Sequence, residues 1–201
     1  MLANGINRPF SEVIESGLGY FVAQCWEWDN FPEFGDLLHV ESNGLLIVGC
    51  VTNINTGSID PMRTPFPYKK TEDQLRVEQP HIFEFLKTTY TAILVGYVDN
   101  DNIVYHLPSR PCKIHSFVSP CLDDFECDFL GNTDFLDLLF TLSSRVEYFD
   151  ELLLVLINKI HKARAMSEEF IDAFYKKLSL LTGNDYRRLK IFFARVEALQ
   201  G

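Results

Sequence analysis

The sequence has none of the glycine-rich strings that bind nucleotide phosphates. A phosphate-binding loop follows the pattern G-x-x-x-x-G-K-[ST], and a dinucleotide-binding fold follows G-x-G-x-x-G, but neither pattern occurs. The nearest approach, Gly17-Leu18-Gly19, stops after two glycines and comes before an expected strand rather than a helix. We therefore expect that the chain does not hydrolyse nucleotides by itself.

The common hydrolase motifs are also missing. The sequence has no G-x-S-x-G nucleophile elbow and no H-E-x-x-H zinc motif, and its five histidines are scattered without a local partner pattern. It therefore assigns no catalytic residue and implies no cofactor. One enzymatic alternative stays open, namely a site assembled from residues far apart in the sequence, around Arg110, His115 and Cys121.

Paired cysteines are absent as well. The five cysteines are an odd number and contain no C-x-x-C pair, which argues against a disulfide framework and fits a reducing compartment. Four nominal zinc ligands lie within one short stretch, at Cys112, His115, Cys121 and Cys127. They lack the second close pair that structural zinc sites use, so we predict no metal and interpret Cys112 and Cys121 as small buried hydrophobic residues.

Long hydrophobic runs are also lacking. No stretch approaches the roughly 20 apolar residues that a membrane helix needs. The start, MLANGINRPF, has no basic region followed by an apolar one, so we expect no secretory signal. The simplest interpretation is a cytoplasmic protein that does not enter a membrane.

Acidic residues outnumber basic ones, but not evenly along the chain. The net charge of −10 speaks against general affinity for nucleic acids. The segment 120–151 is strongly acidic, whereas the segment 159–195 has more basic than acidic residues. An anion-binding surface is therefore expected only toward the C-terminal end.

The first 120 residues are rich in β-forming side chains. Strands are predicted over Glu12–Trp26, Asp36–Val40, Gly44–Ile54, Thr89–Val98, Ile103–Leu107 and Lys113–Val118. The strings SNG at 42–44 and DNDN at 99–102 predict hairpin turns, because Asn and Gly tolerate the positive φ of a tight turn. Gly96 predicts a bend or a close backbone approach within its strand. Six short strands joined in this way favour a small antiparallel β-barrel.

The long connection at 57–79 contains PMRTPFPYKK, whose prolines favour an extended surface path. Thr71 and Gln74 form a capping-box pattern, which predicts a short helix over 72–78. Pro80 suits the first turn of a second short helix, PHIFEFLK, which we expect to plug or flank the barrel.

Beyond the barrel the hydrophobic period becomes helical. The expected features are an N-cap at Asn132 or Thr133, a central helix over 151–165, a third helix from Ser167 to Gly183, and a fourth after Asn184 and Asp185 with Leu189, Phe192, Val196 and Leu199 as its buried stripe. The prediction is an α+β chain with a β-barrel domain at 1–121, an acidic linker at 122–131 and a helical bundle domain at 132–201.

Basic residues of the last helices form one candidate binding surface. On a helical wheel Arg188 and Arg195 lie one above the other with Arg187 beside them, and Lys176 and Lys177 of the preceding helix extend the patch. Such a face suits a phosphate backbone or an acidic protein. The alternative is a solubilising face paired with local carboxylates.

The proline-rich loop is the second candidate surface. Arg63, Lys69 and Lys70 alternate there with Phe66 and Tyr68 on a stiffened segment. A loop of this composition can dock on a partner or stack on bases. Alternatively, its aromatic side chains fold back and close one end of the barrel.

Two stretches, QPHIFEFLKTTYTAILVG at 79–96 and LPSRPCKIHSFVSPC at 107–121, resemble a small bacterial family of HAS-barrel proteins, best known from cyanobacteria and without an assigned function. That family shows a QPxIFxxLKT segment before the strand and an LPxRPxxIHxxV segment after it. The HAS barrel is the six-stranded domain at the N-terminus of HerA-type DNA translocases and of rotary ATP synthase head subunits. The resemblance implies a barrel that assembles subunits or docks a partner, without the ATPase domain.

The leading hypothesis is a non-enzymatic binding or assembly module. Its protein partner would be contacted by the barrel surface, the 57–80 loop and the basic helical face. The alternative is a nucleic-acid-associated accessory protein that uses the basic face on phosphates, as the resemblance to HerA implies. Neither hypothesis identifies the partner or specifies an oligomeric state.

Overall fold

The computed structural model describes residues 8–62, 64–163, 168–183 and 185–200. Its strands are β1 (Ser11–Gly17), β2 (Tyr20–Cys25), β3 (Leu37–Ser42), β4 (Leu45–Ser58), β5 (Leu86–Asp99), β6 (Asn102–Val104) and β7 (Phe117–Pro120). Six of them close an antiparallel barrel in the order β1-β7-β3-β4-β5-β2, because β2 pairs with both β1 and β5. The short β6 pairs with the end of β5. The predicted α+β class and six-stranded antiparallel barrel are confirmed.

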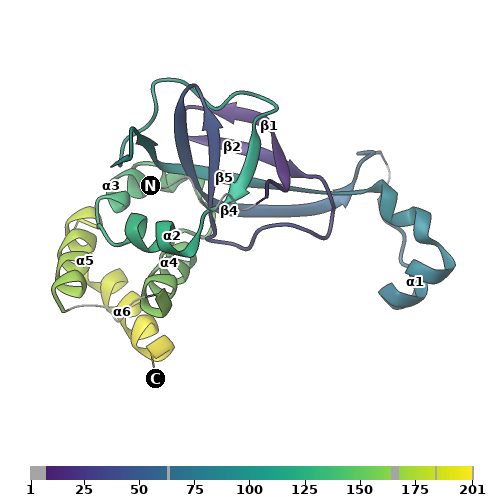
Figure 1. Cartoon of the computed structure of the whole chain (residues 1–201). Helices are drawn as coiled ribbons and strands as arrows, with labels where there is room; N and C mark the ends of the chain where they lie inside the picture. Colours follow the sequence, from purple (N-terminus) through teal and green to yellow (C-terminus); the bar gives the residue numbers. More distant parts are fainter. Residues whose placement is uncertain (1–7, 63, 164–167, 184, 201) are drawn as a thin grey trace.

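The helices from α2 onward gather beside the barrel, whereas α1 lies on the opposite side of the molecule (Figure 1). The helical elements are α1 (Glu72–Glu78), η1 (Pro80–Phe85), α2 (Asp123–Leu130), α3 (Phe135–Thr141), η2 (Ser143–Arg145), α4 (Phe149–Ala163), α5 (Glu168–Leu181) and α6 (Tyr186–Gln200). Within the described ranges, no helix combines the length and the hydropathy that crossing a bilayer requires.

Two hydrophobic clusters share the wall formed by β3, β4 and β5. Successive side chains of a strand face opposite sides, so Ala92 and Leu94 fill the barrel interior while Ile93 and Val95 face the helices. The helices complete the outer cluster with side chains such as Phe129, Leu139, Leu152, Phe174 and Phe192. Burial on both sides explains why AILVGYV at 92–98 is an unbroken apolar run.

Both predicted hairpin turns are confirmed. Asn43 and Gly44 have φ values of 58° and 79° between β3 and β4, and Asn100 and Asp101 have φ values of 47° and 64° between β5 and β6.

Three strand predictions need correction. Glu12–Trp26 is two strands, β1 and β2, that fold back on each other around the turn at 18–19. The predicted strand Lys113–Val118 is displaced to β7, because a turn in which Ser116 N–H donates to Lys113 O precedes it. Ile103–Leu107 is reduced to the short β6.

Gly96 lies at a β-bulge in the β4–β5 ladder. Val48 pairs with Gly96 but Gly49 pairs with Leu94, so Val95 is the extra residue. The φ of Gly96 is 155°, and a Cβ at this position would lie 2.6 Å from the backbone oxygen of Val104. The predicted close backbone approach is confirmed.

The β4–β5 hairpin continues past the barrel and forms a projecting arm, which we define as residues 53–88 (Figure 1). The capping box of α1 is confirmed, since Thr71 and Gln74 exchange hydrogen bonds of 3.0 and 3.4 Å. The second short helix, η1, begins at Pro80 as predicted but does not plug the barrel. It has no buried residue and lies in the arm, because β4 and β5 both run beyond their predicted ends.

The segment 122–131, predicted as an acidic linker, contains a helix. Phe125, Phe129 and Leu130 of α2 are buried in the outer cluster, while the acidic residues of its first turn suit a helix N-terminus. The N-cap of α3 is Asp134 rather than Asn132 or Thr133, although Asn132 Oδ1 accepts a hydrogen bond from Asp134 N–H at 2.9 Å. The division into two domains stays a prediction.

The remaining helix predictions hold where the structure describes them. Half of the described side chains of α4 are buried, and Gly183 (φ 64°) follows the end of α5. Asp185 caps α6, because its Oδ1 accepts the N–H of Arg188 at 3.0 Å. The stripe of α6 is buried at Leu189, Phe192 and Val196. Ser167, Asn184 and the side chain of Leu199 lie outside the described part.

A charged junction ties α4 and α2 to the barrel. Lys159 Nζ donates to Asp36 Oδ1 at 2.7 Å and to Glu126 Oε1 at 3.2 Å. Burial lowers the pKa of Lys159, but the hydrogen bond to Asp36 and the attraction of both carboxylates raise it more, so the net shift is upward.

Gly96→Ala is expected to lower the free energy of unfolding by about 2–3 kcal/mol, because the new Cβ meets a backbone atom and the φ is unfavourable for alanine. The matched control is Gly57→Ala, since a Cβ at Gly57 meets nothing within 4 Å. Urea unfolding of the two variants checks the prediction. Equal stability of both variants would contradict it.

Lys159→Met is expected to lower the free energy of unfolding by about 1–3 kcal/mol at neutral pH, because Asp36 and Glu126 lose their partner. The raised pKa sets the sign of the pH dependence. The contribution of Lys159 is complete below about pH 10, near the ordinary lysine pKa of the unfolded chain, and is lost as the pH rises through the folded value. Unfolding curves for the wild type, Lys159→Met and the exposed-site control Lys162→Met test this. If the difference in free energy of unfolding between the wild type and Lys159→Met grows above about pH 10, Lys159 is not the stabilising cation of this junction.

Candidate interaction surfaces

The arm is built from an exposed two-stranded ladder that ends in a helical tip. Asn53–Ser58 pairs residue by residue with Leu86–Thr91, and this part of β4 has no fully buried residue. Thr56 Oγ1 and Thr88 Oγ1 are hydrogen-bonded across the ladder at 2.8 Å, a favourable cross-strand pair. The ladder thus carries the 59–85 connection out from the barrel.

A stack of rings and one guanidinium fixes the tip against the 26–36 loop. The rings of Trp28 and Phe83 stack with centroids 5.5 Å apart and 14° between their planes. The Arg76 guanidinium lies 5.0 Å from the Phe83 centroid and 6.0 Å from that of Trp28. Arg76 also pairs with Asp29 and Glu72, each at 2.8 Å. The hydrogen bonds to Asp29 and Glu72 raise the pKa of Arg76.

Large apolar side chains are exposed along the arm. Met62 is 92% exposed, Val77 83% and Phe66 72%, and Ile59 and Phe85 are about half exposed. Phe66 lies edge-on to Tyr68 at a centroid distance of 5.8 Å. The aromatic residues of the loop therefore lie out on the arm and do not close the end of the barrel.

The predicted cations of the loop have different surroundings. Lys70 forms an ion pair with Glu78 of α1. Lys69 is exposed and has a φ of 57°. Arg63 lies outside the described residues. The loop therefore presents apolar surface together with at least one cation that has a carboxylate partner.

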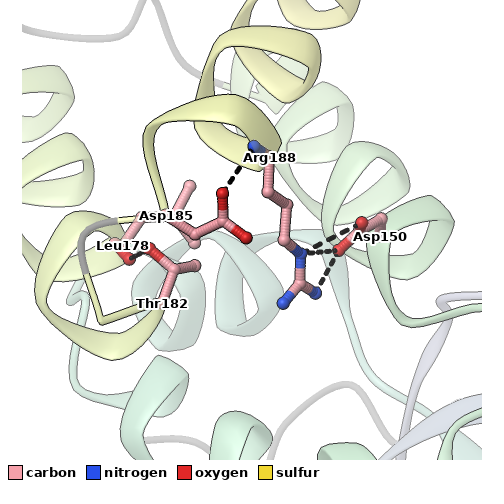
Figure 2. A network of polar contacts seen from close by, with 5 residues as sticks. All are labelled: Asp150, Leu178, Thr182, Asp185 and Arg188. Atoms are coloured by element: carbon pink, nitrogen blue, oxygen red, sulfur yellow. Dashed lines mark hydrogen bonds and ion pairs between the residues drawn. The ribbon is translucent and has the colours of Figure 1, made fainter.

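The second surface is the outer face of α6, where arginines meet the acidic start of α4. Arg188 Nε lies 3.1 and 3.2 Å from the two carboxylate oxygens of Asp150, as Figure 2 shows. Arg195 Nη2 lies 2.7 Å from Glu151 Oε2. The hydrogen bond from Arg195 lowers the pKa of Glu151. These two arginines therefore link α6 to α4.

The other predicted cations of this face differ in their surroundings, since one is paired with carboxylates and two are exposed. Lys177 is paired with Asp137 at 2.5 Å and with Asp134 at 3.4 Å, so it connects α5 to α3. Lys176 and Arg187 are exposed. The structure thus brings Arg187, Arg188 and Arg195 onto one helix face, while Lys177 points to a different neighbour.

Two shallow hollows lie along α4 and α6. The first, of about 250 Å³, is lined by Arg187, Arg188, Ile191, Phe192 and Arg195 together with Asp150 and Asp185. The second, of about 340 Å³, is lined by Glu151, Leu154, Val155, Asn158, Arg195 and Ala198. Arg195 contributes to both. Carboxylates share each hollow with the arginines, so neither hollow has the uniformly positive lining that suits a phosphate.

The four nominal zinc ligands are not assembled into one site. Cys112 belongs to the cluster inside the barrel, whereas Cys121 belongs to the cluster under the helices. His115 is largely exposed and is bonded to Glu12. Within the described residues, no three His, Cys, Asp or Glu side chains are grouped so as to hold a metal ion.

The distant-residue enzyme site gains no chemical support. Burial raises the pKa of the Cys112 thiol to about 11, and it raises the pKa of Cys121 further. Burial therefore disfavours the thiolate form that a nucleophilic cysteine needs. His115 has its ring nitrogen on Glu12, at the surface.

Sequence reasoning missed the stack of Trp28, Phe83 and Arg76. Trp28 stands in the string EWDN, and Arg76 follows Glu72 by four residues. The i,i+4 spacing indicates the Arg76–Glu72 pair. No local pattern indicates that Trp28 and Asp29, more than forty residues earlier in the chain, complete the group.

No protein-family model matches the chain, and no curated protein matches it significantly. The case for a function therefore rests on the geometry described above.

Arg188→Met is expected to lower the free energy of unfolding by about 0.5–1 kcal/mol, since the pair with Asp150 is partly exposed and screened by solvent. The control is Arg187→Met on the same turn, which is expected to change it by less than about 0.3 kcal/mol. Thermal unfolding at low and high salt measures both. A cost for Arg187→Met equal to that for Arg188→Met would show that Asp150 is not the important partner.

Proposed function

We propose that the protein is a non-enzymatic binding and assembly module that contacts a protein partner through its arm. One observation carries this proposal: the exposed apolar side chains of Ile59, Met62, Phe66, Val77 and Phe85 are all borne by one projecting element. Exposed apolar residues gathered in one place mark protein interaction sites, whereas scattered ones carry no such meaning. The ring stack at Trp28 supports the proposal, because it holds the tip in place.

We also propose that the barrel is of the HAS type. The closed ring of six antiparallel strands is compatible with this assignment, and the stretches at 79–96 and 107–121 carry the resemblance. In HAS-barrel ATPases the barrel assembles subunits or docks a partner, which agrees with a contact role here.

We propose a cytoplasmic location on the cysteine pattern, and the five cysteines are free thiols.

The nucleic-acid alternative stays a prediction. Arg188 and Arg195 are bonded to Asp150 and Glu151, so a phosphate would have to displace a carboxylate from each. Exposed Arg187 and Lys176 are the remaining predicted cations of this surface. The geometry therefore favours the arm over α6 as the contact element.

The arm is tested by replacing two tip residues, Phe66→Glu together with Val77→Glu. Both side chains are mostly exposed, so the free energy of unfolding is expected to change by less than about 0.5 kcal/mol. Recovery of the partner from the cells that make the protein is expected to fall at least about tenfold, because two contact residues become charged. Quantitative pull-down with and without nuclease measures this.

The matched control is Leu180→Glu, an exposed apolar residue (73%) on α5. It is expected to leave recovery unchanged. An equal loss with Leu180→Glu, or no loss with the tip variant, would reject the arm as the contact element. Recovery that disappears on nuclease treatment would instead support the nucleic-acid alternative.

A further inference from the structure

One edge of the arm is an open strand edge. β4 pairs along one side with β5 for its whole length, but on the other side it pairs with β3 only from Leu45 to Cys50. Val51 then exchanges hydrogen bonds of 2.9 Å with Gly35 and Asp36. From Asn53 to Ser58, no other strand of the described chain lies against this edge.

The hydrogen-bond pattern shows which backbone groups the open edge presents. Ile59 N–H donates to Phe85 O at 2.8 Å, so this opposed pair is hydrogen-bonded. In an antiparallel ladder, hydrogen-bonded and non-hydrogen-bonded pairs alternate. Asn53, Asn55 and Gly57 therefore direct their backbone groups to β5, whereas residues 54, 56 and 58 direct theirs outward.

The open stretch has no charged side chain, proline or bulge, which are features that commonly prevent the edge strands of two molecules from pairing. Natural edges are blunted by charged side chains, prolines or bulges. The whole of β4, LLIVGCVTNINTGS, contains no charged residue and no proline. Its ladder with β5 shifts only at Val48/Gly49 and at Val51/Asn53, before the open stretch begins. A strand with these properties is suited to pairing with another strand.

We propose that the open edge pairs with the same edge of a second copy of this chain, antiparallel and about a two-fold axis at Thr56. This inference rests on the proposed function in taking the arm as the contact element, but it names a different part of the arm and a different occupant. The tip remains available to another protein, and the ladder edge is used for self-association.

The position of Thr56 is what favours a second copy over a foreign strand. The outward-facing residues of the open stretch Asn53–Ser58 are Ile54, Thr56 and Ser58, and Thr56 is the middle one of the three. A two-fold axis at Thr56 places each of these three residues opposite an outward-facing residue of the second copy, whereas an axis at Asn55 or Gly57 leaves one of them without such a partner within the stretch. The open edge is therefore complementary to itself over its whole length, which the edge of an unrelated strand need not be.

In this register the two paired strands also end together, so neither strand extends past the open edge of the other. With Thr56 opposite itself, Ile54 faces Ser58 of the other copy, and each copy's Asp60 lies beside the other's Thr52. Each strand thus ends where Gly35 and Asp36 already occupy the edge of its neighbour. A two-fold axis places like residues together, so an uncharged edge avoids self-repulsion, and a threonine pair at its centre is favourable.

The test compares the wild type with Thr56→Pro and Thr56→Val by sedimentation velocity and light scattering. Proline removes the outward N–H, which the chain's own ladder does not use, and is tolerated at an edge. Valine also loses the hydroxyl bond to Thr88 but keeps that N–H. At about 100 μM the wild type and Thr56→Val are expected to be dimeric, and Thr56→Pro is expected to associate at least about tenfold more weakly.

A second readout does not depend on the folding of the proline variant. Thr56→Cys and Ser58→Cys are each made in a background in which the partly exposed Cys127 is serine. Cysteines at 56 would lie about 5.5 Å apart across the axis, and cysteines at 58 about 13 Å apart. A thiol crosslinker shorter than about 10 Å is expected to join the first pair and not the second.

A monomeric wild type at about 100 μM, a Thr56→Pro dimer as tight as the wild-type dimer, or equal crosslinking at 56 and 58 would overturn the proposal. None of these results bears on the tip, whose partner is measured with Phe66→Glu and Val77→Glu. Failure of self-association and failure of the proposed function are therefore separate outcomes.

Discussion

The ladder between β4 and β5 is the interaction on which the rest of the structure depends. Its inner part consists of two adjacent strands of the barrel wall, and β5 closes the barrel by pairing with β2. Its outer part is the arm. Because one continuous hydrogen-bonded ladder supplies both, the direction of the arm follows from the twist and register of the barrel. The bulge at Gly96 sets that register at one end, and the bulge at Thr52 marks where the arm leaves the barrel.

The same ladder explains how a small barrel supports so many helices. The inner faces of β4 and β5 fill the barrel, and their outer faces give the helices an apolar surface on which to pack. This arrangement makes the sheet wall a buried layer between two cores. The junction of Lys159 with Asp36 and Glu126 adds polar specificity at the margin of that layer.

The barrel could be predicted from the sequence because its signals are local. Asn43-Gly44 and Asn100-Asp101 are turn residues with a direct steric reason, and the two-sided burial of β5 is visible as an apolar run. The length of the arm could not be predicted, since polar NINTGS has weak strand signals and is ordered by its partner strand. The helix within the segment 122–131 was not predicted for a related reason. The acidic residues of α2 suggest a solvated segment, whereas three apolar side chains decide its burial.

The candidate surfaces were predicted with uneven success. The proline-rich loop was correctly taken as exposed, and the arginines of α6 do share one face. Their partners Asp150 and Glu151 are on α4, at distances along the chain over which a helical wheel carries no information. The group of Trp28, Phe83 and Arg76 was invisible because its members come from three separate segments that only the folded chain brings together.

That ring and guanidinium group has a consequence for the kinetics and thermodynamics of any encounter at the tip. A tip without it would have to be ordered by its partner, and the lost conformational entropy would weaken binding. Stacking of Phe83 on Trp28 lowers that entropic cost, because it orders the tip before the encounter. The ion pairs of Arg76 weaken as ionic strength rises, whereas the stacked rings do not depend on salt in this way. A partner that binds the tip as proposed is therefore expected to keep much of its affinity in concentrated salt, as is typical of an apolar contact presented on a rigid support.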